Sequence, residues 1–152
     1  MEKTKNVIYL PKSINREITF MLHNYKNMDK LIDSRKDDLI DKINVTNNAY
    51  LKAINRANNT LEDMIIRFEK DEIINKYKRW EQVINSFINE LYNENDIVGY
   101  YIIKYKYLDK RDEEFICEHM NLTKEDFKFE DIRLKCSLYI KAKSIGLIKE
   151  VD

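Results

Sequence analysis

The sequence predicts an all-α protein, and its composition and residue spacing both support this. Only two glycines and one proline occur in 152 residues, whereas strand-rich folds concentrate these residue types in many tight turns. Apolar residues recur at spacings of three and four, which align them on one face of a helix. Hydrophobic residues make up 43% of the chain, so we expect a folded core rather than disorder.

The N-terminal half begins with a predicted flexible arm over 1–12, because Pro11 disfavours a helix before it. Ser13 is placed to cap a helix that runs over 13–44. The apolar positions of this helix alternate at spacings of four and three, a narrow stripe that needs a partner helix. They are Ile14, Ile18, Met21, Tyr25, Met28 and Ile32. Residues 44–60 are rich in asparagine, which competes for helical hydrogen bonds, and we interpret them as a linker.

A second long helix is predicted to begin near Thr60, and it carries the clearest periodicity. Its apolar stripe, the predicted oligomerisation seam, consists of Ile73, Tyr77, Trp80, Ile84, Phe87 and Leu91. This seam and the stripe over 14–32 suit an antiparallel hairpin or coiled-coil-like pairing with a second chain as a homodimer. Core packing within a monomer is the alternative. We therefore assign 13–92 to a long-helix hairpin or oligomerisation region.

The C-terminal region, 93–152, is predicted to hold a helix-turn-helix. Residues 97–108 mix β-branched and aromatic side chains, and we interpret them as helix because no partner strand follows. The segment 112–120 is then separated by three residues from a helix over 124–145, a spacing typical of this motif. Thr123 is the expected N-cap of the last helix and Gly146 its C-terminal cap. The predicted buried side consists of Phe115, Ile116, Met120 and Leu122.

The charges are balanced in number but not in position. Lys+Arg 27 and Asp+Glu 27 cancel, so the net charge does not indicate a nucleic-acid partner. Residues 132–149 nevertheless hold five cations and no carboxylate. Residues 124–131 hold four carboxylates against two lysines, and carboxylates near phosphates repel DNA. A later helix start, with 124–129 as an extended turn, is the alternative for this acidic run.

Enzyme, metal and membrane functions are not predicted. The soft metal ligands are two cysteines and two histidines, and the spacing of Cys117 and His119 makes their side chains diverge on a helix. No nucleophile has a supporting catalytic motif, and Gly99 and Gly146 stand apart from any phosphate-binding loop. We therefore expect no cofactor. No apolar run reaches the length of a membrane span and no secretory leader is recognisable, so we expect a reduced, cytoplasmic setting.

The order of parts resembles known regulators. Residues 100–108, the helix over 113–120 and the turn Asn121-Leu122-Thr123 resemble the sigma-factor region 4 type of helix-turn-helix. Over 13–148 the chain resembles the ArpU/RinA-type family of phage late transcriptional regulators. That likeness rests on a Leu-x-x-Tyr element at 22–25, a charged heptad-like run, a polar linker, a long middle helix and the helix-turn-helix. Family members usually carry basic and small polar residues where this chain has the acidic run.

The resemblance implies a DNA-binding regulator, most simply an activator of phage late and packaging genes in the cytoplasm of a bacterial host. Its partners would be double-stranded DNA and bacterial RNA polymerase. The predicted DNA-contact residues are Lys124, Lys128, Arg133, Lys135, Lys141 and Lys143, preceded by Lys104, Lys110 and Arg111. These last three are equally compatible with an ordinary solvated face. The alternatives are a protein-interaction module that binds RNA polymerase or a repressor, and a small terminase-like DNA-packaging subunit.

Overall fold

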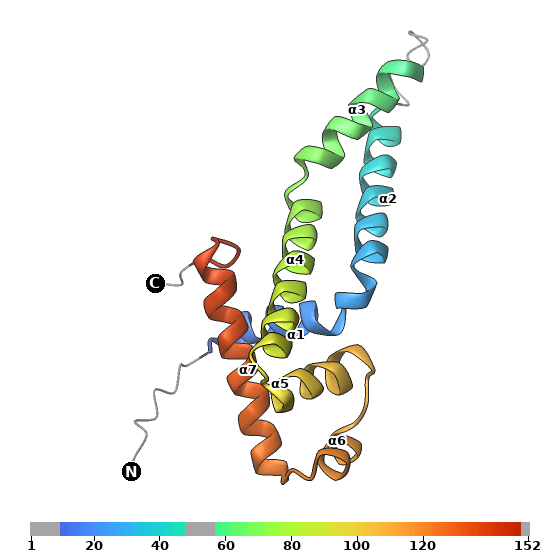
Figure 1. Cartoon of the computed structure of the whole chain (residues 1–152). Helices are drawn as coiled ribbons and strands as arrows, with labels where there is room; N and C mark the ends of the chain where they lie inside the picture. Colours follow the sequence, from blue (N-terminus) through green and yellow to red (C-terminus); the bar gives the residue numbers. More distant parts are fainter. Residues whose placement is uncertain (1–9, 48–56, 150–152) are drawn as a thin grey trace. The chain divides into compact units, whose positions relative to one another are not determined.

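A computed structural model describes residues 10–47 and 57–149, and every regular element in these two ranges is helical (Figure 1). The all-α prediction is therefore confirmed. The elements are α1 (Lys12–His23), the 3-10 turn η1 (Tyr25–Asn27), α2 (Met28–Asn47), α3 (Ala57–Lys70), α4 (Glu72–Asn93), α5 (Ile97–Ile102), the π-helix η2 (Ile103–Leu108), α6 (Glu113–Met120) and α7 (Lys124–Ser144). They fall into two compact units. The middle unit is Asn27–Glu81, and the terminal unit comprises the residues before and after it.

Two predicted long helices are each divided in the structure. The helix expected over 13–44 is wrong as a single element, because α1 ends at His23 and η1 separates it from α2. The predicted cap at Ser13 is also wrong, because α1 begins at Lys12 with Pro11 at its N-cap and no side chain caps it. The side-chain amide of Asn24 donates to the carbonyl oxygen of Phe20 at 2.8 Å, which satisfies a terminal helical acceptor. Both ends of the predicted linker over 44–60 are helical, since α2 reaches Asn47 and α3 begins at Ala57. Residues 48–56 lie outside the described residues.

The second expected helix is divided at Asp71, which separates α3 from α4. The Asp71 carboxylate accepts a hydrogen bond from the backbone amide of Ile74 at 2.9 Å, so it caps the first turn of α4. Two hydrogen bonds from the Arg35 guanidinium, at 3.1 and 3.0 Å, reach the same carboxylate. These bonds from Arg35 hold the pKa of Asp71 below its usual range, against the opposing effect of burial.

The middle unit is an antiparallel pair of helices continued by the start of α4. Helices α2 and α3 contact each other, and Arg35 on α2 reaches Asp71 just past the end of α3. One residue further along α2, the ammonium of Lys36 lies 5.5 Å from the ring centroid of Phe68. Leu61 and Ile65 on α3 are exposed. The same unit also buries Met28, Ile32, Ile74 and Trp80, so apolar burial and these polar and cation–π contacts both contribute to it.

The terminal unit has a continuous apolar core. Helix α1 packs against α7 and η2, and α5 packs against α7. The fully or almost fully buried side chains of these elements include Ile18, Leu22, Ile84, Ile102, Ile103, Tyr107, Ile116, Leu134 and Leu138. The C-terminal half of α4 contributes Phe87 and Leu91 to the buried set.

The predicted seam on α4 is only partly buried. Trp80, Ile84, Phe87 and Leu91 are buried, whereas Ile73 is 41% exposed and its neighbour Ile74 is fully buried. Periodicity alone does not distinguish two adjacent isoleucines at the start of a helix. Pairing of this seam with a second chain stays a prediction.

Candidate nucleic-acid interface

Helices α6 and α7 are joined by a short connection with capping side chains on both sides. The carboxylate of Asp112 accepts from the amide of Phe115 at 2.8 Å and so caps α6. Helix α6 ends at Asn121, which adopts a left-handed conformation with φ of 55°. The hydroxyl of Thr123 then accepts from the amide of Asp126 at 3.0 Å and caps α7. The predicted cap at Thr123 is confirmed, and the alternative of an extended turn over 124–129 is wrong.

The inner faces of α6 and α7 are apolar. Of the four residues predicted to be buried, Ile116 is fully buried, and Phe115, Met120 and Leu122 are half-buried. Phe127 on the first turn of α7 is also buried. Gly146, with φ of +75°, follows the end of α7 as predicted. These two helices therefore pack as one unit with the α5–η2 segment, which contacts both.

A buried carboxylate ties η2 to α7. Asp131 on α7 is 6% exposed. It accepts a hydrogen bond from the Tyr107 hydroxyl at 2.5 Å and one from the Lys106 ammonium at 2.6 Å. Burial, and then the charge of Asp131, raise the pKa of Tyr107 far above its ordinary value, so the hydroxyl remains a donor. The ammonium of Lys135 lies 3.5 Å from the same carboxylate.

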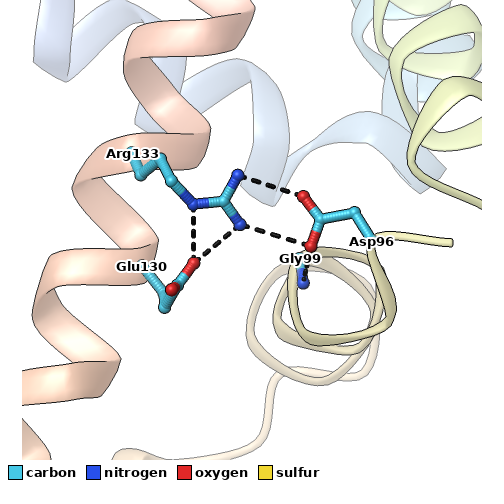
Figure 2. Close-up of polar contacts among 4 residues, drawn as sticks. All are labelled: Asp96, Gly99, Glu130 and Arg133. Atoms are coloured by element: carbon cyan, nitrogen blue, oxygen red, sulfur yellow. Dashed lines mark hydrogen bonds and ion pairs between the residues drawn. The ribbon is translucent and has the colours of Figure 1, made fainter. Parts of the chain in front are cut away.

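Arg133 lies between two carboxylates of the terminal unit, as Figure 2 shows. Its guanidinium donates to Asp96 at 3.0 and 3.3 Å and to Glu130 at 2.6 Å. Asp96 also accepts from the amide of Gly99 at 3.0 Å and caps α5. A Cβ at Gly99 would lie 2.9 Å from that carboxylate, so glycine permits the close approach. Burial alone would raise the pKa of Asp96, but the bonds from Arg133 and Gly99 outweigh it and lower the pKa.

The cations predicted to bind DNA therefore fall into two groups. Three of them are engaged with carboxylates of their own unit: Arg133 as above, Lys135 with Asp131, and Lys141 with Glu90. The side chain of Lys135 is only 11% exposed. The others are exposed, namely Lys104, Lys110, Arg111, Lys124, Lys128 and Lys143.

Several of the exposed cations are positioned by aromatic rings or carbonyl groups. The ammonium of Lys104 lies 5.9 Å from the ring centroid of Tyr101, and the guanidinium carbon of Arg111 lies 4.5 Å from that of Phe115. The ammonium of Lys110 donates to the backbone carbonyl of His23. Lys124 and Lys128 are four residues apart on the first turns of α7, so they project from one side of the helix.

A chain of aromatic rings that was not predicted runs across α4, α5, η2 and α6. Its members are Tyr92, Tyr100, Tyr101, Tyr105, Phe115 and His119, with neighbouring centroids 5.2–5.8 Å apart. The signal available was the density of tyrosines over 100–107. Two of these rings, Tyr101 and Phe115, lie next to the exposed cations Lys104 and Arg111.

His23 is expected to make the stability of the terminal unit depend on pH. Its ring meets that of Tyr107 edge-on at 4.8 Å. Burial, and then the charge of Lys110, lower the pKa of His23, so the folded chain favours the neutral ring. The resulting stability is present above the ordinary histidine pKa and is lost as the pH falls below it. Urea unfolding of wild type and H23Q between about pH 8 and pH 5 is expected to show a shallower decline for H23Q, and equal slopes would contradict this.

Within residues 10–47 and 57–149, no three His, Cys, Asp or Glu side chains converge as a metal site would require. None of the helices in those ranges is both long enough and apolar enough to cross a membrane. Comparison with known protein families, curated proteins and solved structures finds no match for this chain. Function is therefore inferred from the side chains themselves.

Proposed function

We propose that the chain is a sequence-specific DNA-binding transcriptional regulator, in which α7 enters the major groove and α6 lies behind it. The observation that carries the proposal is the capped connection of α6 to α7 together with the packing of α5–η2 against both. A short connection between two packed helices of this kind is typical of helix-turn-helix proteins. The protein is then a binding protein and not an enzyme.

The resemblance to ArpU/RinA-type regulators supports a narrower role. Under this proposal the chain activates late and packaging genes of a phage in the cytoplasm of its bacterial host, with RNA polymerase as a second partner. Double-stranded DNA is the primary partner. The long helices of the middle unit leave Leu61, Ile65 and Ile73 exposed, which fits a role in association with another chain.

The proposed DNA contacts are chosen from the cations that are exposed and not paired with a carboxylate of their own unit. Lys124 and Lys128 are exposed on the first turns of α7, where a recognition helix meets the groove. Lys104 on η2 and Arg111 just before α6 are exposed and are suited to phosphate contact. Arg133, Lys135 and Lys141 neutralise carboxylates of their own unit, so the proposal does not use them. The exposed carboxylate of Glu125 is able to accept a hydrogen bond from cytosine N4.

The double variant K124Q/K128Q is expected to weaken DNA binding about tenfold near 0.1 M salt. It is also expected to reduce the slope of the logarithm of the binding constant against the logarithm of the salt concentration. The expected reduction is about 0.9 for each lysine that contacts a phosphate. Fluorescence anisotropy with a duplex selected from a randomised pool measures both quantities. The matched control is K30Q/K78Q, which removes two exposed lysines from the middle unit and is expected to leave both quantities unchanged. Failure to select any duplex at low salt would overturn the proposal.

A second candidate function is a protein-interaction module that binds RNA polymerase or a repressor. The observation that favours it is the exposure of Phe129, Ile132 and Ile140 on α7, since apolar side chains are unusual on a face that contacts only DNA. Salt-sensitive binding to a selected duplex supports the first function. Stoichiometric binding to purified RNA polymerase, with no duplex selected, supports the second.

A further inference from the structure

The outward face of α7 carries a stripe of apolar side chains, three of which are exposed. Phe129, Ile132 and Ile140 are 67%, 55% and 51% exposed, and Cys136 is half-buried. Spacings of three and four place these four residues on one side of the helix. The opposite side faces the core through Phe127, Leu134 and Leu138. We call the four outward residues, together with Glu125 and Lys143 at their ends, the α7 stripe.

The order of residues in the α7 stripe is nearly symmetric about Leu134. Ile132 and Cys136 lie two residues on either side of it, and Phe129 and Ile140 lie five and six residues away. Glu125 and Lys143 lie nine residues before and after it. Both of these charged side chains are exposed. The stripe therefore has an apolar middle, a negative charge at one end and a positive charge at the other.

We infer that the α7 stripe binds the α7 stripe of a second copy of this chain in antiparallel orientation. A two-fold axis near Leu134 brings Glu125 of each copy opposite the partner's Lys143, and it brings each Ile132 opposite the partner's Cys136. Parallel pairing would instead set Glu125 against Glu125 and Lys143 against Lys143. A two-fold interface requires a surface that is complementary to itself. The α7 stripe is complementary to itself in antiparallel orientation. An interface with an unrelated protein does not require this complementarity.

The size of the stripe sets the expected strength of the dimer. The distance along the helix from Glu125 to Lys143 is about 27 Å. One helix pair of this length buries less than the standard interface of about 1,600 Å². The dimer is therefore weak and reversible, with a dissociation constant in the micromolar range.

Self-association would also regulate the site proposed for DNA. The stripe includes Glu125 and Phe129 on the face of α7 that would enter the major groove, so a dimer formed through it excludes DNA. This competition rests on the proposed function, whereas the dimer itself does not. Added duplex is then expected to dissociate the dimer into DNA-bound monomers.

The test is sedimentation of the full chain over micromolar concentrations, without DNA. The wild type is expected to show a monomer–dimer equilibrium, and both E125K and K143E are expected to weaken it at least tenfold. The double variant E125K/K143E restores opposite charges across the interface and is expected to recover the wild-type equilibrium. The matched control D126K makes the same charge change in the same helical turn but projects to the side of the stripe, so it is expected to leave dimerisation unchanged. Circular dichroism verifies that every variant folds.

Three outcomes would overturn the inference: a wild-type monomer throughout the micromolar range, a dimer insensitive to E125K, or a double variant no better than the single ones. If the dimer is insensitive to E125K but is lost when residues of the α4 seam are substituted, the dimer interface lies on that seam. If the dimer behaves as expected but no duplex is selected, the proposed function fails and the dimer stands. If duplex binds and the dimer persists in the complex, the competition fails.

Discussion

Replacing Trp80 by alanine is expected to lower the free energy of unfolding by about 4 kcal/mol, the range observed when large buried aromatics are truncated. Trp80 is fully buried on α4 and is one of the largest buried side chains in the described ranges. Its loss leaves a cavity that the surrounding helices fill only in part. Urea unfolding followed by far-ultraviolet circular dichroism measures the change, because W80A removes the only tryptophan of the chain.

The control for this prediction is W80F. The indole Nε1 of Trp80 is buried and has no hydrogen-bond acceptor in the part of the chain that the structure describes. A phenyl ring keeps most of the apolar volume and gives up no hydrogen bond, so W80F is expected to cost only about 1 kcal/mol. If W80A were as mild as W80F, Trp80 would be solvated in solution and the assigned core position would be wrong.

Helix identity was predictable, but several helix ends were not. Thr123 and Gly146 stand next to clear periodic segments, and both act as caps in the structure. Asn24 and Asp71 also end or begin helices, yet asparagine and aspartate are so frequent in this chain that neither stands out. The π-helix η2 was not predicted. It packs against α1 and α6, and Lys106 and Tyr107 bond to Asp131 on α7, which are contacts that local propensity does not reveal.

The ion pairs of the α7 cations explain why the site was harder to predict than the fold. The pairs Glu130–Arg133 and Asp131–Lys135 lie three and four residues apart, so helical spacing alone indicates them. Arg133 with Asp96 and Lys141 with Glu90 are 37 and 51 residues apart. No pattern in one sequence reveals such distant pairs, so the sequence alone overstates how many cations of α7 are unpaired.

The exposed stripe on α7 follows a helical spacing and was in principle predictable from the sequence. Phe129, however, lies within the acidic run over 124–131, which was considered as an extended turn. Once α7 is known to begin at Lys124, Phe129 and Ile132 fall on one side of the helix. The missing information was the position of the helix start.

Replacing Asp131 by alanine is expected to cost about 3 kcal/mol, because removing one partner of a buried ion pair leaves the other without compensation. The Asp131 carboxylate receives both the Tyr107 hydroxyl and the Lys106 ammonium. The side chains of Lys106 and Lys135 are 26% and 11% exposed, so both retain some access to water. Because of this access to water, the expected loss of stability lies at the lower end of the range observed for buried ion pairs.

The conservative comparison is Y107F, which removes one hydrogen bond from Asp131 and keeps both lysines paired. It is expected to cost about 1 kcal/mol. Urea unfolding monitored by Trp80 fluorescence measures both variants under the same conditions. If D131A is no more destabilising than Y107F, the ion pairs of the two lysines with this carboxylate contribute little to the free energy of unfolding. Lys135 would then be available to a phosphate after all, and it would return to the set of proposed DNA contacts.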